Sequence, residues 1–133
     1  MPANPRDPQV WFDFAAKDLD RAHKRLAEGD AEDCLFHLQQ TAEKACKGKL
    51  IELGWNLRKT HDLTQLIQEL EDRSLNLDYY SETASVLSSG YIAERYPGFS
   101  DEPIDLDLLR EHLKLTQRLF ETLSGRKGLL EEV

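Results

Sequence analysis

Apolar residues recur along most of the chain at steps of three and four positions, which is the spacing of one face of an α-helix. This pattern predicts five helices, over about residues 8–28, 31–53, 61–73, 78–94 and 106–124. The sequence contains no extended alternation of apolar and polar residues, the pattern typical of a half-buried β-strand. It therefore predicts an all-α fold.

Residues that start and stop helices stand at the ends of these segments. A side-chain oxygen at a helix start accepts a hydrogen bond from a free backbone N–H, and a glycine after a helix tolerates left-handed backbone. The predicted N-caps are Asp7, Asp30, Thr60 and Asp105, and the predicted stops include Gly29, Gly54 and Gly125. Because the connections are short, neighbouring helices should be antiparallel. We expect an up-and-down bundle of about five helices, with one shorter helix laid across it.

The chain has 133 residues, a length that predicts one domain. We expect its core to span about residues 8–124, with residues 1–7 and 125–133 flexible. Its 17 Lys and Arg residues against 25 Asp and Glu residues give a formal net charge of -8. This acidic balance argues against a protein that coats nucleic acid or anionic membranes, because such proteins use a surplus of basic residues. A localised basic pocket is compatible with it.

Two further features bear on the cellular compartment. No stretch approaches the roughly 20 apolar residues that span a bilayer, and residues 1–12 lack the basic and hydrophobic parts of a signal peptide. Cys34 and Cys46 fall in one predicted helix, about 18 Å apart at 1.5 Å per residue, and so cannot bridge each other. We expect buried free thiols and a cytoplasmic protein with no membrane partner.

The second predicted helix interrupts its apolar pattern with polar residues at four-residue steps. These residues are Gln39, Glu43 and Lys47, with the parallel pair Gln40 and Lys44. The favoured interpretation is a solvated face with i,i+4 pairing between Glu and Lys. The alternative is a polar patch packed against His61 and Asp62 at the start of the third predicted helix, where a helix N-terminus also favours anions.

The end of the fourth predicted helix places two aromatic residues and an arginine before a proline. Arg95 could pair bidentately with a phosphate or a carboxylate, and Tyr91 or Tyr96 could cover a base. The favoured interpretation from these residues alone is structural. Arg95 would then complement the negative end of its own helix, and the tyrosines would be core or dimer-interface residues.

The remaining chemistry-bearing residues indicate no cofactor. The four histidines are scattered, without the spacing of a metal site, so no metal is expected. His61 is best explained by local hydrogen bonding at a helix start. The sequence contains no P-loop, no dinucleotide-binding glycine motif and no nucleophile elbow.

Four segments in order resemble the HEPN domain, named for higher eukaryotes and prokaryotes nucleotide-binding. They are residues 11–22, residues 34–47 (CLFHLQQTAEKACK), residues 59–63 (KTHDL), and Tyr91 with the Arg-Tyr-Pro of residues 95–97. The resemblance runs from about residue 10 to residue 123. It implies an all-α bundle that often forms a dimer.

Many members of this family are metal-independent ribonucleases with an Arg followed four to six residues later by a His. Arg95 matches the arginine, but residues 96–102 contain no histidine, and His112 is too far along the chain. Because RNA cleavage needs a general acid or base near the phosphate, this departure disfavours a nuclease. Were the chain a ribonuclease, Arg95 and a spatially close His61 would be its candidate catalytic residues.

Other family members bind nucleotides without cleaving them, or stand beside a minimal nucleotidyltransferase. The resemblance thus implies that Arg95 holds a phosphate, Tyr91 or Tyr96 lines the pocket, and Lys44 and Lys47 add positive charge. Glu43 and Asp62 would orient these cations, with His61 nearby.

Three functions follow as hypotheses. The first is a non-catalytic nucleotide- or nucleic-acid-binding homodimer that partners a minimal nucleotidyltransferase, in a toxin–antitoxin or defence system. The second is a ribonuclease toxin, and the third is a structural adaptor that binds only protein. The sequence does not say which nucleotide, RNA or partner protein is recognised.

Overall fold

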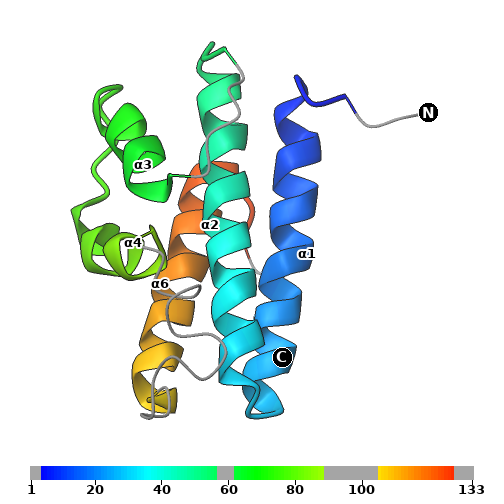
Figure 1. Cartoon of the computed structure of the whole chain (residues 1–133). Helices are drawn as coiled ribbons and strands as arrows, with labels where there is room; N and C mark the ends of the chain where they lie inside the picture. Colours follow the sequence, from blue (N-terminus) through cyan, green and yellow to red (C-terminus); the bar gives the residue numbers. More distant parts are fainter. Residues whose placement is uncertain (1–3, 57–61, 89–104, 128–133) are drawn as a thin grey trace.

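Three long helices run side by side through the centre of the molecule (Figure 1). The computed structural model describes residues 4–56, 62–88 and 105–127. The long helices are α1 (Pro8–Ala27), α2 (Ala31–Glu52) and α6 (Leu106–Ser124). α2 packs against both of the others, and α1 also contacts α6. A connection of three residues reverses the chain between α1 and α2, so these two helices are antiparallel.

Two short helices cover one side of α2 and α6. They are α3 (Leu63–Glu71) and α4 (Ser81–Ser88), and a 3-10 turn, η1 (Asp78–Tyr80), leads into α4. α3 packs on α2 and α4, and α4 packs on α2 and α6. The described residues contain no strand, which confirms the predicted all-α bundle. The fourth predicted helix differs at its start, where Asp78–Tyr80 form a 3-10 turn, and its last residues lie outside the described ranges.

Aspartates cap four of the helices. Asp7, Asp30 and Asp105 each accept a hydrogen bond from a backbone N–H of the first turn, as predicted. The predicted cap Thr60 is wrong, because α3 begins at Leu63 and its cap is Asp62, whose carboxylate accepts from the Gln65 N–H. Hydrogen bonds from the Thr64 hydroxyl and from Gln65 hold the pKa of the Asp62 carboxyl below its usual value. The three predicted glycine stops have positive φ angles of 77°, 93° and 74°.

The core lies between the three long helices and beneath α3 and α4. Leucines from every described α-helix contribute to it, together with Phe12, Phe120 and Tyr80. The buried Tyr80 hydroxyl is hydrogen-bonded to the Thr116 hydroxyl at 2.7 Å. Cys34 and Cys46 are buried free thiols, as predicted, and burial raises the pKa of Cys34 to about 12. No helix of the described ranges combines the length and the apolar character that crossing a membrane requires.

A histidine buried in this core gives the protein a pH-dependent stability. The His112 ring is hydrogen-bonded through Nδ1 to the Thr83 hydroxyl at 2.8 Å. Burial lowers its pKa, and the nearby Glu82 and Glu111 oppose that effect only in part. In the unfolded chain the same histidine has a pKa of about 6.5. As the pH falls, the unfolded chain therefore takes up a proton on His112 before the folded protein does. The resulting stabilisation is complete above the pKa of the unfolded chain, and it is lost as the pH falls from there through the lower pKa of the folded protein.

We expect the wild-type protein to lose more unfolding free energy than His112→Gln when the pH is lowered from 7 to 5.5. The limit for one proton is about 1.4 kcal/mol per pH unit. Urea unfolding of both proteins at each pH measures the difference, and the glutamine can keep the bond to Thr83. Parallel losses in the two proteins would contradict a depressed His112 pKa.

Candidate functional site

Lysines of α2 lie against aromatic residues of α1 along one edge of the α1–α2 pair. The Lys47 ammonium lies 5.6 Å from the centre of the Trp11 ring. One turn away, the ammonium groups of Lys44 and Lys17 lie 5.9 and 5.4 Å from the centre of the Phe14 ring. Because the two helices are antiparallel, the three-residue step from Trp11 to Phe14 matches the step from Lys47 to Lys44. We call these five residues the lysine–aromatic seam.

Lys47 forms a buried ion pair with Glu43 on the same helix. The Nζ to Oε1 distance is 3.2 Å, and the two residues are only 5% and 4% exposed. The interpretation of this polar row as a solvated face is therefore wrong for these two residues. The physical reason is that this part of α2 packs against the start of α1, where Gly48 lies close to Phe12 and Trp11. Gln39, Gln40 and Lys44 of the same row are half-buried.

Lys44 is held by a carboxylate of α1 rather than by its own helix. Its Nζ lies 2.6 Å from Oδ2 of Asp18, which is only 3% exposed. The other carboxylate oxygen of Asp18 lies 2.9 Å from Nδ1 of His37. Sequence reasoning missed Asp18. The available signal was its position, because residue 18 lies on the apolar side of its helix, between Ala15 and Ala22.

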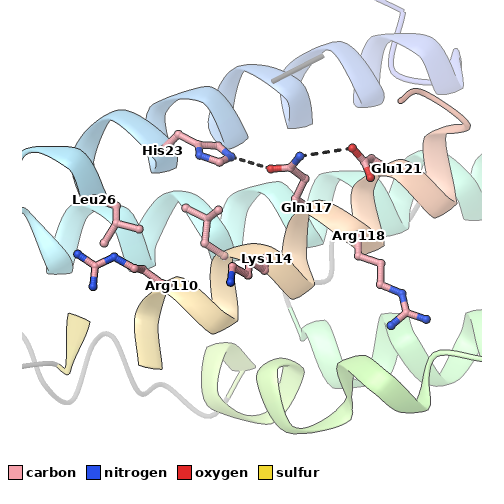
Figure 2. Close-up of a pocket in the computed structure, with 8 residues that line it drawn as sticks. His23, Leu26, Arg110, Lys114, Gln117, Arg118 and Glu121 are labelled. Carbon is pink, nitrogen blue, oxygen red and sulfur yellow. Dashed lines mark hydrogen bonds between the residues drawn. The ribbon is translucent and has the colours of Figure 1, made fainter. Parts of the chain in front are cut away.

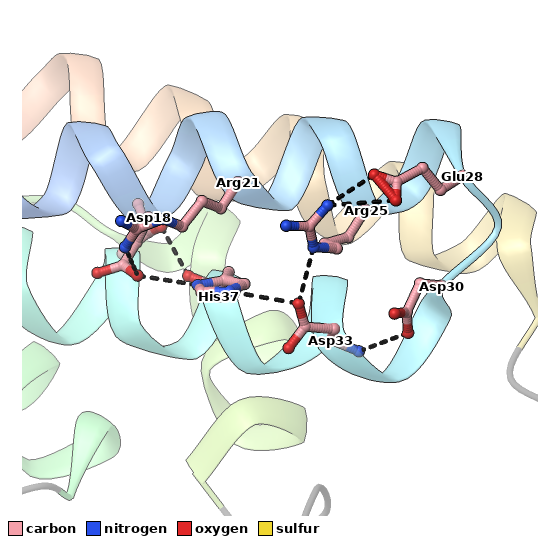
Figure 3. A network of polar contacts seen from close by, with 8 residues as sticks. Asp18, Arg21, Arg25, Glu28, Asp30, Asp33 and His37 are labelled. Carbon is pink, nitrogen blue, oxygen red and sulfur yellow. Dashed lines mark hydrogen bonds and ion pairs between the residues drawn. The ribbon is translucent and has the colours of Figure 1, made fainter.

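The polar contacts continue from Asp18 along α1 and α2 (Figure 3). His37 Nε2 lies 3.4 Å from Asp33, and Asp33 accepts a hydrogen bond of 3.0 Å from Arg25. Both nitrogens of the His37 ring therefore face carboxylates, Nδ1 facing Asp18 and Nε2 facing Asp33. This alternation of acids and bases ties α1 to the first half of α2 and fixes the side chain of Asp18.

The accessible part of the seam combines an aromatic ring with positive charge. Phe14 is 44% exposed, which leaves much of its surface open to a ligand. Lys17 is exposed, and Arg21, with an exposed guanidinium, lies 3.9 Å from the Asp18 carboxylate. Two cations, Arg21 and Lys44, thus share one carboxylate, and Lys17 stands beside the ring. An open ring beside cations is the arrangement that stacks a base and pairs with a phosphate.

The structure brings together part of the set of residues that the sequence singled out. Glu43, Lys44 and Lys47 lie along the seam or directly beneath it. Asp62 accepts hydrogen bonds from Thr64 and Gln65 at the start of its own helix. The other predicted ligand-binding residues lie outside the described ranges; they are His61, Tyr91, Arg95 and Tyr96. Among the described residues, no three His, Cys, Asp or Glu side chains are placed to hold a metal ion.

Comparison with known proteins adds one finding. A family model described as HEPN domain matches residues 8–127, which is most of the chain. No curated protein and no solved structure is significantly similar to the chain.

Proposed function

The chain belongs to the HEPN domain family, and from this premise we propose that it is a non-catalytic module that binds a nucleotide or nucleic acid. The family assignment supports a nucleotide- or RNA-related role. In the proposal the module acts in the cytoplasm as a homodimer and partners a minimal nucleotidyltransferase, in a toxin–antitoxin or defence system. The absence of histidine from residues 96–102 favours binding over cleavage.

The observation that carries the proposal is the open Phe14 ring with two ammonium groups beside it. Stacking of a base on an aromatic ring contributes about 1–3 kcal/mol and tolerates any base. Lys17 and Lys44, at 5.4 and 5.9 Å from the ring centre, are near enough to pair with the phosphate of a stacked nucleotide. The net charge of -8 makes a confined site of this kind more suitable than a long basic surface.

The remaining residues of the proposed site have separate roles. Lys47 and its partner Glu43 stay buried and hold α2 against Trp11, so that Lys44 is presented at the surface. Asp18 fixes the direction of Lys44. The proposal keeps Arg95 as a second phosphate ligand, Tyr91 and Tyr96 as residues that line the pocket, and Asp62 and His61 as polar groups beside it.

A nucleotide panel tests this proposal. A ligand present at a hundredfold excess over its Kd stabilises the folded state by about 2.7 kcal/mol. We expect ATP, GTP, their diphosphates or a 12-nucleotide RNA to raise the melting temperature of the wild-type protein. Phe14→Leu should weaken that ligand at least tenfold by calorimetry, the loss expected for removal of one stacking ring. Arg95→Ala should weaken it as well.

Phe36→Leu is the matched control, because Phe36 is 42% exposed on α2 and packs on His37, and no lysine of the described ranges lies over its ring. It should bind like the wild type. Failure of the whole panel to stabilise the wild type would remove the binding proposal. RNA cleavage that Arg95→Ala abolishes would replace it with the ribonuclease hypothesis.

The proposed assembly has its own tests. Light scattering should give twice the chain mass of 15.3 kDa, and a monomer would remove the homodimer from the proposal. Co-expression with a minimal nucleotidyltransferase encoded beside the gene should yield a complex that persists through gel filtration. Complex formation that no nucleotide influences, with no nucleotide bound, would favour a purely structural adaptor.

A further inference from the structure

A second surface with a defined shape lies between α1 and α6 (Figure 2). It is a groove of about 330 Å³. Leu26 of α1 and Leu113 of α6 give it an apolar floor, and Leu26 is half-buried there. His23 lines the same groove from α1. His23 follows Phe14 by nine residues, which is about two and a half helical turns, and so lies on the opposite side of α1 from the seam.

Basic residues follow one another along the α6 side of the groove. Arg110, Lys114 and Arg118 stand at successive four-residue steps and therefore share one side of the helix. Arg110 and Lys114 have side chains that are 52% and 73% exposed, and each faces a carboxylate of its own helix, Asp107 or Glu111. Exposed ion pairs of this kind contribute little to stability, so an acidic side chain of a ligand can compete for these cations.

The remaining polar groups of the groove are already engaged. The amide of Gln117 bridges His23, at 2.7 Å, and Glu121, at 3.4 Å (Figure 2). Glu121, at one end of these contacts, is the only acidic residue among the described residues that line the groove. The Arg118 guanidinium stacks at 3.8 Å over the Tyr79 ring of η1, so its charged end is directed away from α1 (Figure 2).

We propose that this groove binds an acidic amphipathic helix of a partner protein. Two antiparallel helices with an apolar floor form the groove into which a third helix packs. α3 and α4 cover another side of the bundle, where α3 packs on α2 and α4 packs on α2 and α6. Among the described residues, no element covers the groove between α1 and α6. From Arg110 to Glu121 the lined part of α6 is roughly 16 Å long, or three helical turns. Leucines of the partner would meet Leu26 and Leu113, and its acids would meet Arg110 and Lys114.

The composition of the groove favours a protein over a nucleic acid. Its floor is aliphatic, whereas base stacking requires aromatic rings. A chain with a net charge of -8 repels a long polyphosphate, but a short helix with flanking acids meets only the local basic residues. Comparing the affinity for an acidic peptide with the affinity for RNA therefore distinguishes a protein ligand from a nucleic acid ligand.

Fluorescence anisotropy with three labelled probes tests the proposal on the whole chain. The first probe is a synthetic 14-residue helical peptide with leucines on one face and glutamates beside them. The second carries lysine in place of each glutamate, and the third is a 12-nucleotide single-stranded RNA. We expect the acidic peptide to bind at least tenfold more tightly than either of the others at the same salt concentration.

Two double variants with reversed charges show where the acidic peptide binds. Arg110→Glu combined with Lys114→Glu should weaken the acidic peptide at least tenfold, since both changed side chains are largely exposed. Lys49→Glu combined with Arg73→Glu makes the same change in charge at two other i,i+3 or i,i+4 ion pairs and should change affinity less than twofold. Thermal unfolding checks that each variant is folded. Equal affinity for all three proteins, or no binding of the acidic peptide, would overturn the proposal. RNA binding that the first variant abolishes would assign the groove to nucleic acid instead.

Discussion

Glu43→Gln is expected to lower the free energy of unfolding by about 3 kcal/mol, the size of effect seen when a buried ion pair loses one partner. The change keeps the shape of the side chain but removes the charge that lies 3.2 Å from the Lys47 ammonium. Lys47 is 5% exposed and lies over Trp11, so its charge cannot move into water without disturbing the packing of α1 on α2. Urea unfolding at pH 7 measures the loss.

Two further variants separate burial from simple pairing. Asp20→Asn breaks another acid–lysine pair with the same four-residue spacing, at a shorter distance of 2.9 Å, but with side chains that are 38% and 64% exposed. It should cost less than about 1 kcal/mol. The double variant Glu43→Gln with Lys47→Met should recover part of the stability, since no charge then stays buried in the pair. An equally small loss for Glu43→Gln and Asp20→Asn would show that Lys47 is not confined as described.

Gly48→Val is expected to destabilise the protein by about 2–3 kcal/mol, a loss typical of an overpacked core. A Cβ atom at residue 48 would stand 2.7 Å from Cε1 of Phe12 and 3.1 Å from Cβ of Trp11. Phe12 is fully buried, so its ring can yield only by displacing neighbouring core atoms. The clash outweighs the few tenths of a kcal/mol that valine gains over glycine in helix propensity. Thermal and urea unfolding measure the result.

The control is Ala27→Val, which adds the same kind of side chain at an exposed helical position and should cost only a few tenths of a kcal/mol. Phe12→Leu removes ring atoms that the larger side chain at position 48 would meet. Combined with Gly48→Val, it should therefore give a total loss smaller than the sum of the two single losses. A Gly48→Val protein as stable as the wild type would mean that α1 and α2 are not in close contact at this point.

The helices were predictable because their signals are local. Asp7, Asp30 and Asp105 cap helices by bonding to N–H groups two or three residues away, and the apolar steps need no knowledge of the partner helix. The residue at which α3 begins was not predictable in this way. Thr60 and Asp62 both carry a suitable oxygen, and only the extended backbone at Asp62, with φ -81° and ψ 100°, shows which residue caps the helix.

The candidate site was predictable only in part, because its contacts join distant residues. The four-residue spacing of Glu43 and Lys47 is visible in the sequence, but their burial depends on the approach of α1 at Gly48. The sequence likewise does not reveal that Lys44 pairs with Asp18, 26 positions earlier. The spacing of Phe14 places it on the apolar stripe of the first helix, whereas its ring is 44% exposed beside two lysines.

NMR mapping of a bound nucleotide shows whether the lysine–aromatic seam is part of the binding surface. The backbone amide signals of the ¹⁵N-labelled protein would be followed during titration with the best ligand of the panel. We expect the largest shifts in residues 11–21 and 40–47, together with residues 91–96. Shifts confined to the groove residues 110–121, or no shifts at saturating nucleotide, would mean that the seam does not bind the nucleotide.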